Sequence, residues 1–270
     1  MRVGVIGCGQ MGRPMAEALL GAGYDLRGLD VRPAAAFGAF AAHVTNDPAQ
    51  MSDRSVLLSV VRDIPQTEAA LFGPGGVLAA GAPSVLAICS TVSPAYIRAL
   101  PPRLPPGVAL VDAPMSGAPV AARERRLTFM LGGQSDVIDG VMPLFRVMGQ
   151  SFHRLGDLSA GMTAKVLNNL IAASSVAATR TALDWGAEMG LTTGALRAVF
   201  HESSGQTWFG SGFDRIDFAR EGFAPDNTMA ILQKDVESLL DAAPSGSDPA
   251  LARAVIAAIQ ALRPFPEDTN

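Results

Sequence analysis

Two lysines stand out in a chain whose other basic side chains are arginines and three histidines. Lys165 and Lys234 are the only lysines among 21 Lys and Arg residues. Lys165 lies in an alanine-rich segment, and Asn169 follows four residues later, on the same face if the segment is helical. Because lysine loses its proton far more readily than arginine when desolvated, Lys165 could act as a general acid or base. The alternative is an exposed lysine on an amphipathic helix, with Asn168 and Asn169 as polar surface.

A glycine-rich turn near residue 10 could hold a phosphate. Gly7, Gly9 and Gly12 have the spacing G-x-G-x-x-G, between an apolar run at 3–6 and a helical pattern at 15–20. In a strand–turn–helix unit the first glycine allows a sharp turn. The second lets the backbone approach a pyrophosphate, and the third lets helix and strand pack closely. The N–H groups at the helix start would hold the phosphates. The alternative is a tight turn in an α/β protein without a nucleotide.

Asp30 ends a second apolar run at 24–31, where an acid would accept hydrogen bonds from a ribose. An acid at this position favours NAD, because it repels the 2′-phosphate of NADP. Arg32, two residues later, could instead pair with that phosphate. We therefore predict NAD as the cofactor and keep NADP as the alternative.

Three further buried strands are predicted at 55–61, 84–88 and 108–111. Ligands of parallel sheets lie beyond the carboxyl ends of the strands. Those ends carry the candidate contact residues Val60, Val61, Thr91, Ser116, Gly117 and Ala118. Thr91 could contact a cofactor or cap the next helix. The small residues at 116–118 could offer successive N–H groups to a carboxylate or form an ordinary turn.

The element pattern changes at residue 160. Before it, strands alternate with helices at 33–42, 64–71 and within 132–148, and two further strands are predicted at 127–131 and 151–155. After it, only helices are predicted, at 161–189, 193–200, 211–218, 229–243 and 251–262. The predicted fold class is α/β, with a Rossmann-like, doubly wound parallel sheet at 1–159 and an all-α domain at 160–270.

Composition narrows the functional classes. The chain has 270 residues, 49% of them apolar, and a net charge of −4, which argues against a nucleic-acid-binding protein. No apolar run approaches the length of a membrane span, and the first strand leaves no room for a signal peptide. Cys8 and Cys89 are predicted to be buried reduced thiols, which favours the cytoplasm. Two cysteines and three scattered histidines predict no metal site.

Four blocks of sequence together resemble the β-hydroxyacid dehydrogenase family, whose best-known member is 3-hydroxyisobutyrate dehydrogenase. They are the cofactor loop at 7–16, the substrate motif at 112–118, the catalytic helix at 161–169 and a late Lys-Asp pair within 232–235. The resemblance implies a Rossmann-like domain, an all-helical domain and an active site in the cleft. It also implies hydride transfer between a nicotinamide and the hydroxyl-bearing carbon of a small carboxylate.

The resemblance also implies roles for single residues. Lys165 would be the general acid or base, and Asn169 would orient the reacting oxygen. Ser116, Gly117 and Ala118 would hold the substrate carboxylate. The residues that line the cofactor would be Gly7, Gly9, Gln10, Met11, Gly12, Asp30, Val60, Val61, Thr91 and Lys234.

Three features depart from the family pattern. Ala118 stands where a second glycine is usual. Arg123 and Arg125 stand where an acid and a glycine are expected; we interpret them as surface residues, with a more anionic substrate as the alternative. The chain after Asp235 is short, and a break at 242–249 interrupts a region that should be helical.

Other functions and residues are kept as alternatives. The substrate could be an imine or a semialdehyde such as tartronate or succinic semialdehyde. A non-catalytic dinucleotide-binding sensor would keep the glycines without needing Lys165. His201 could be a rival base, although a surface role is more typical, and Trp208 and Phe209 could line a pocket or belong to the core. Small residues along the long helix predict a homodimer or a higher homo-oligomer.

Overall fold

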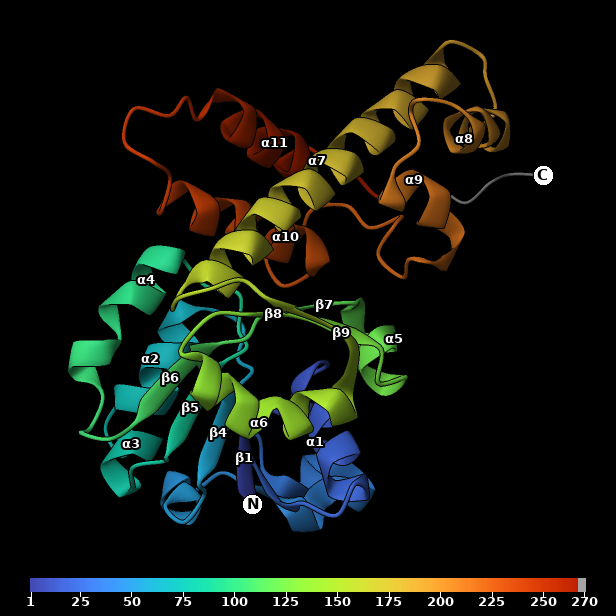
Figure 1. The fold of residues 1–270 in the computed structure, drawn as a ribbon. Coiled ribbons are helices and arrows are strands. Elements are labelled where there is room, and N and C mark those ends of the chain that lie inside the picture. The colour runs from blue at the N-terminus through green and yellow to red at the C-terminus, as the bar shows by residue number, and fades with distance from the viewer. Residues whose placement is uncertain (267–270) are drawn as a thin grey trace. The chain divides into compact units, whose positions relative to one another are not determined.

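A six-stranded parallel sheet organises the N-terminal part of the chain (Figure 1). The computed structural model describes residues 1–266. The strands are β1 (Arg2–Ile6), β2 (Asp25–Leu29), β3 (Val44–Thr45), β4 (Val56–Ser59), β5 (Val85–Ile88) and β6 (Ala109–Asp112). Their order is β3-β2-β1-β4-β5-β6, and every neighbouring pair is parallel. The order reverses between β1 and β4, so ligands are expected beyond the carboxyl ends of these two strands.

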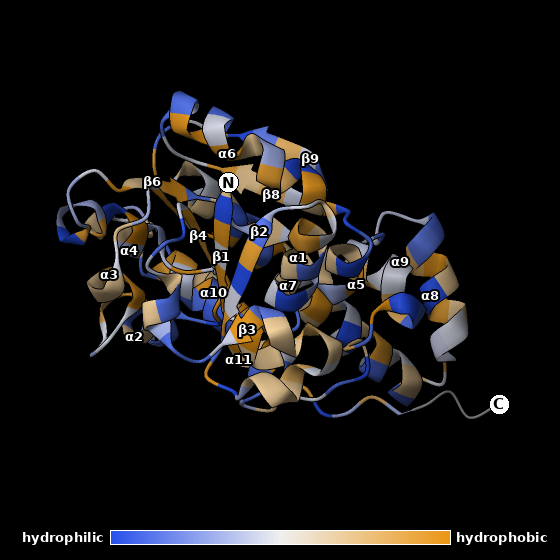
Figure 2. Cartoon of the chain, turned by 90° about the horizontal axis from the view of Figure 1, so that it is seen from below, coloured by the Kyte–Doolittle hydropathy of each residue, from blue (hydrophilic) through white to orange (hydrophobic). Residues whose placement is uncertain are grey.

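The strands are apolar on both faces because helices cover both sides. Val3 and Val5 belong to one buried apolar cluster, whereas Ile6 belongs to another. In β4, Val56 and Leu58 likewise belong to the first cluster and Leu57 belongs to the second. Successive side chains of a strand point to opposite faces, so each cluster covers one face of the sheet. Hydrophobic residues accordingly colour much of β1 and β4 in Figure 2.

The connecting helices follow the predicted pattern except after β2. They are α1 (Gly12–Gly21), α2 (Ile64–Phe72), α3 (Val77–Ala80) and α4 (Pro94–Ala99), with 3₁₀ segments at Ala34–His43, Pro48–Met51 and Pro101–Arg103. The helix predicted at 33–42 is therefore present, but as a 3₁₀ segment at Ala34–His43 and not as an α-helix. Gly38 adopts φ 57° and ψ −126°, which kinks the segment and prevents a continuous α-helix.

The strands predicted at 127–131 and 151–155 form a sheet of their own. β7 (Met115–Ser116), β8 (Leu127–Leu131) and β9 (Gly149–Arg154) pair in that order, antiparallel and then parallel. The two-residue strand β7 was not predicted; it is followed by α5 (Ala118–Arg123), after which the chain returns antiparallel to β7 as β8. α6 (Ser135–Met148) places Val141, Leu144 and Phe145 in the core.

The remaining elements are helices. α7 (Ala160–Glu188) is followed by α8 (Thr193–Glu202), α9 (Trp208–Gly212), a 3₁₀ turn at Phe213–Arg215, α10 (Thr228–Leu240) and α11 (Ala250–Gln260). Val176, Leu183, Phe209, Val236 and Ile259 lie in their apolar core. Of the helix predicted at 211–218, residues 211–215 are helical, as the end of α9 and the 3₁₀ turn, whereas residues 216–218 are not. The α-helix ends at Gly212, and glycine has low helix propensity.

Contacts between Cα atoms divide the chain into two compact units, residues 1–165 and 166–270. The division falls inside α7. The boundary predicted between residues 159 and 160 stays a prediction, and residues 267–270 of that predicted domain lie outside the described part. Within residues 1–266, no helix combines the length and apolar character of a membrane span. Cys8 and Cys89 are buried and unpaired, as predicted.

Candidate functional site

In the glycine turn after β1, the fold requires glycine at positions 7 and 12 but not at position 9. Gly7 has φ 89°, and a Cβ there would lie 2.8 Å from the carbonyl oxygen of Val60. A Cβ on Gly12 would lie 1.8 Å from the carbonyl oxygen of Gly7. In contrast, a Cβ on Gly9 would have no neighbour within 4 Å. The fold therefore does not require glycine at position 9, and the open space beside it fits the approach of a dinucleotide pyrophosphate.

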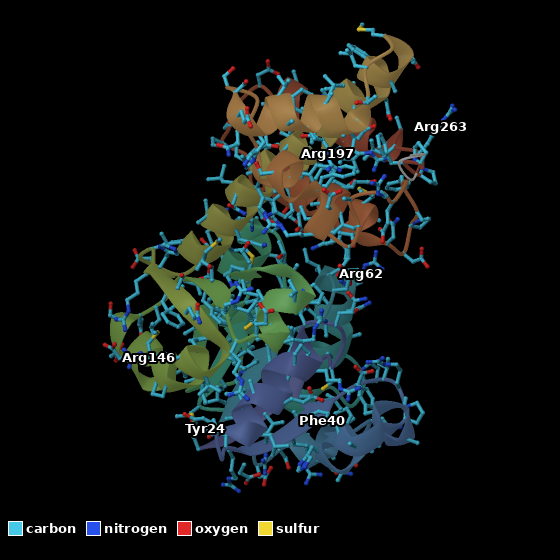
Figure 3. All side chains as sticks on the ribbon, turned by 90° about the vertical axis from the view of Figure 1, so that its right-hand side faces the viewer. Tyr24, Phe40, Arg62, Arg146, Arg197 and Arg263 are labelled. Atoms are coloured by element: carbon cyan, nitrogen blue, oxygen red, sulfur yellow. The ribbon has the colours of Figure 1, made fainter. Side chains whose placement is uncertain are left out.

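The residues beside this turn come from the carboxyl ends of β1 and β4. Gln10 is exposed and Met11 is half-buried against the core. Val60 donates its N–H to Ile6 and, with Val61, packs against Gly7. Arg62 follows at the same end of the sheet, opposite the end where Tyr24 precedes β2 (Figure 3).

Thr91 follows β5 at the same end of the sheet and is half-buried. The side chain that caps α4 is that of Ser93, which accepts the N–H of Ala95 at 3.0 Å. The cap role considered for Thr91 is therefore wrong. Contact with a cofactor stays a prediction for this residue.

Asp30 lies beside the glycine turn with both carboxylate oxygens bonded. Oδ2 accepts the N–H of Cys8 at 2.9 Å, and Arg32 donates its backbone N–H and Nε to Oδ1 and Nη2 to Oδ2. Burial works to raise the pKa of Asp30, but these hydrogen bonds outweigh it and lower the pKa below its ordinary value. The Arg32 guanidinium also lies 4.6 Å from the centre of the Phe37 ring. Asp30 is thus an ionised acceptor already paired with the arginine that follows it.

The turn at 116–118 has an unusual backbone. Ser116 ends β7, Gly117 has φ 138° and Ala118 has φ 56°. The left-handed conformation costs an alanine roughly 1 kcal/mol, which explains why glycine would be preferred at Ala118. Arg123 and Arg125 are exposed, in agreement with their interpretation as surface residues.

Lys165 is buried, with 8% of its surface exposed. The alternative of an exposed lysine on an amphipathic helix is therefore wrong. The first turn of its helix, α7, is attached to the sheet by Asp112, which is fully buried at the end of β6. Asp112 accepts the N–H groups of Ser159 and Met162 at 2.8 and 2.6 Å. Burial raises the pKa of Asp112, although the backbone hydrogen bonds partly oppose this rise.

In the helical unit, Asn169 and Lys234 meet at a buried carboxylate. Asn169 donates Nδ2 to Oδ2 of Asp235, and its own Oδ1 accepts Asn168 Nδ2 at 3.1 Å. Lys234 Nζ lies 2.6 Å from the other oxygen of Asp235, a close ion pair without hydrogen-bond alignment. Asp235 is 2% exposed and Asn169 is 7% exposed. The Asn169 amide is thus held in one orientation, whereas Asn168 lies on the surface.

Two of these residues had no predicted role. Asp112 and Asp235 each stand inside a block that carried the family resemblance, yet their partners are 50 and 66 residues away in sequence. The available signal was an acid directly after a buried strand and an acid next to one of only two lysines. Neither pattern identifies a partner so distant along the chain.

The rival residues lie elsewhere. His201 is exposed on α8, and its Nδ1 lies 3.1 Å from Ser211 Oγ. Phe209 belongs to the core, whereas Trp208 is 56% exposed. Among residues 1–266, no group of three or more His, Cys, Asp or Glu side chains is placed to hold a metal ion.

Two family models match the chain. Residues 2–156 match the NAD-binding domain of 6-phosphogluconate dehydrogenase, and residues 159–262 match the NAD-binding domain of NADP-dependent 3-hydroxyisobutyrate dehydrogenase. An NAD-dependent L-serine dehydrogenase of Pseudomonas aeruginosa is 36% identical, over 77% of this chain and 71% of its own. An L-threonate dehydrogenase of Cupriavidus necator is 33% identical, over 89% and 83%. The structure of Mycobacterium tuberculosis 3-hydroxyisobutyrate dehydrogenase with L-serine is 29% identical, has a TM-score of 0.78 and covers 95% and 92%.

Proposed function

Since this chain belongs to the β-hydroxyacid dehydrogenase family, we propose that Lys165 is the acid–base group with which it oxidises a small hydroxy acid. The protein is an NAD(P)-dependent oxidoreductase that acts on hydroxy acids. The observation that carries the residue assignment is the burial of Lys165 one turn into a helix that is attached to the sheet.

When bound, the nicotinamide supplies hydride acceptance or return at the carbon that bears the hydroxyl. Lys165 Nζ takes the hydroxyl proton during oxidation and gives it back during reduction. Asn169, one helical turn further along α7, orients the reacting oxygen with the amide N–H that Asp235 does not use. Its amide cannot rotate without breaking the bonds to Asp235 and Asn168.

We propose a small β-hydroxy acid similar to 3-hydroxyisobutyrate, or its semialdehyde, as the substrate. The names of the relatives support this class, since L-serine, L-threonate and 3-hydroxyisobutyrate are all small hydroxy carboxylates. The backbone N–H groups of Ser116, Gly117 and Ala118 hold its carboxylate. Ala118 is the first residue of α5, and the first N–H groups of a helix have no partner inside it, which supports this role.

For the cofactor we propose NAD in preference to NADP. Asp30 is ionised at neutral pH and accepts hydrogen bonds at the end of β2, where the adenosine ribose of a dinucleotide lies in such sheets. The pyrophosphate lies against Gly9, Gln10 and Met11. Val60, Val61 and Thr91 line the cofactor from the next strands, and Lys234 is predicted to contact it from the helical unit.

The decisive experiment compares Lys165→Met with Arg253→Met, which removes a long cationic side chain from an exposed position on α11. We expect Lys165→Met to lower kcat at least 100-fold with small hydroxy acids while the affinity for NADH stays within threefold of wild type. Arg253→Met should leave both unchanged. Retained turnover in Lys165→Met would remove Lys165 from the reaction. NADH binding without turnover of any hydroxy acid by wild type would favour imine substrates or a sensor.

We also propose that the protein is a homodimer and works in the cytoplasm. A set of exposed apolar side chains, defined here as the α7 stripe, consists of Leu167, Ile171 and Trp185 on α7 and Met189 directly after its last residue; they are 49–77% exposed. Their spacing follows the helical period, so they share one face. An isologous contact with the same stripe of a second copy would bury it. The unpaired thiols of Cys8 and Cys89 support the compartment.

A further inference from the structure

The first turn of α7 is capped by a residue from the sheet. Asp112 ends β6, and its two oxygens accept the N–H groups of Ser159 and Met162 at 2.8 and 2.6 Å. The first N–H groups of a helix have no partner inside the helix, so a carboxylate there stabilises the helix start. A local side chain would meet that need. Asp112 instead lies 47 and 50 residues before the amides that it binds, so its bonds also attach α7 to β6.

Two glycines leave this carboxylate almost no space. A Cβ on Gly132 would lie 2.4 Å from Asp112 Oδ1, and one on Gly161 would lie 3.0 Å from Oδ2. The Gly161 Cβ would also lie 2.3 Å from the carbonyl oxygen of Met130. Neither glycine has a positive φ, so backbone conformation does not require glycine at these positions. Close approach of the helix start to β6 and β8 does require it.

The helix start is fixed by further contacts. Met162 is fully buried in the apolar cluster on one face of the sheet, and its sulfur lies 3.5 Å from the N–H of Val92. Ser159 has φ 80°, a left-handed conformation that is unfavourable for serine and is held by the bond to Asp112. The height and rotation of the first turn therefore depend on this buried carboxylate together with the packing of Met162.

Lys165 follows Met162 by three residues, so any shift of the first turn moves its side chain directly. We propose that Asp112 is a positioning residue for the reaction: by binding the first turn of α7 it sets where Lys165 Nζ stands. This inference rests on the proposed role of Lys165. A displacement of about 1 Å in a reacting group can cost on the order of 100-fold in rate.

The test replaces the carboxylate by its isosteric amide. Asp112→Asn keeps the shape of the side chain but replaces one carboxylate oxygen by an NH₂ group. That group is a donor and would face the N–H of Ser159 or Met162, which is also a donor. We expect kcat to fall about 30-fold or more, while KM and the dissociation constant of NADH change less than threefold. Rates are normalised to folded protein by NADH fluorescence titration. Asp47→Asn, the same change at the start of the 3₁₀ segment Pro48–Met51, should change none of these values.

The two lysines provide a readout that does not need turnover. In protein labelled with ¹³C-lysine, Lys165 and Lys234 give two Cε resonances, which Lys165→Met assigns. Asp112→Asn should shift or broaden the Lys165 resonance and leave Lys234 as an internal reference. If both resonances and kcat match wild type, Asp112 does not position Lys165. If kcat falls but the Lys165 resonance stays, the effect reaches the reaction by another route and the inference is wrong.

The results for Asp112→Asn can be distinguished from a failure of the role proposed for Lys165. Retained activity in Lys165→Met would overturn the proposed role of Lys165 and, with it, this inference. The Lys165 resonance in Asp112→Asn would still report whether Asp112 sets the position of that lysine. Should Asp112→Asn not fold, native-state hydrogen exchange of wild type decides. Slow exchange of the Ser159 and Met162 amides, as slow as the middle of α7, supports the anchor. Exchange at the rate of an open helix end overturns it.

Discussion

At the residue scale, the cofactor preference depends on how Asp30 and Arg32 share one set of bonds. An ionised carboxylate has about four acceptor positions. Asp30 already accepts from the Cys8 N–H and three donors of Arg32. A ribose hydroxyl must therefore displace a bond from Arg32, whereas a 2′-phosphate would draw the guanidinium away from the acid. Arg32 opposes NAD binding at the position where Asp30 favours it.

We expect Arg32→Ala to make the protein more selective for NAD. The affinity for NADH should rise several-fold because Asp30 becomes available, and the affinity for NADPH should fall about tenfold as a charge-assisted contact is lost. Fluorescence titration with both reduced cofactors measures the two constants. Arg2→Ala, an exposed arginine in β1, serves as the control. An unchanged NADPH affinity would show that Arg32 does not contact the 2′-phosphate.

Arg32→Ala should also change how the stability of the folded protein depends on pH in the acid range. The pKa of Asp30 is lowered in the folded protein, so its contribution to stability is present above its ordinary value of 3.8 and is lost as the pH falls through the folded value. Arg32→Ala should reduce this contribution, and the variant should lose less stability than wild type on acidification below 3.8.

At the element scale, the three glycines in the turn between β1 and α1 have different roles: folding requires two of them and we expect cofactor binding to require the third. Gly12 permits contact between α1 and the backbone of Gly7, and Gly7 needs its positive φ to make the turn. Gly9 has neither a positive φ nor a close neighbour. Glycines of one motif therefore serve different purposes, and substitution can tell them apart.

We expect Gly9→Ala and Gly12→Ala to fail in different ways. Gly9→Ala should keep the thermal midpoint within about 2 °C of wild type, a change of less than about 1 kcal/mol, and weaken NADH binding at least tenfold. Gly12→Ala should destabilise the protein by about 3 kcal/mol or prevent folding, because its Cβ meets backbone atoms. Thermal unfolding and fluorescence titration are the measurements. Unchanged NADH affinity in Gly9→Ala would contradict a pyrophosphate at this glycine.

At the scale of the whole molecule, the α7 stripe exposes large apolar side chains that a single chain does not bury. Trp185, in the last turn of α7, is 61% exposed, and Met189, directly after the helix, is 77% exposed. Large apolar side chains gathered on one face mark interaction surfaces more often than scattered ones do. The same helix carries Lys165 near its start, so assembly and chemistry are built on one element.

We expect Trp185→Glu to convert a dimer to monomer, because a carboxylate in an apolar interface is costly to desolvate. Sedimentation velocity gives the mass, and circular dichroism checks that the helices persist. Leu251→Glu provides the control, since Leu251 is 65% exposed on α11 and lies outside the stripe. A wild-type monomer, or a Trp185→Glu dimer as tight as wild type, would contradict the proposed interface.

Much of the fold and of the site could be predicted because the signals are local. Val3, Val5 and Ile6 mark a buried strand by their types, and Gly7, Gly9 and Gly12 mark the turn by spacing. The change from alternating elements to helices near residue 160 follows from hydrophobic period alone. Two predicted helices differ from the structure in type or extent, and in each a glycine kinks the segment or ends the α-helix, at Gly38 and Gly212. The separate second sheet was not predicted, because which strands pair depends on residues far apart in the chain and not on local sequence.

The sequence by itself determined the types of the longer elements, the dinucleotide turn and the candidate Lys165, since each depends on neighbours within a few positions. Only the tertiary structure decided that Lys165 is buried, that Asp112 holds the start of α7 and that Asp235 joins Asn169 to Lys234. The physical reason is that a buried polar group must find a partner wherever the fold brings one near. Asp112 lies 47 and 50 residues from the amides that it binds, and Asn169 lies 66 residues from Asp235, beyond the reach of any local pattern.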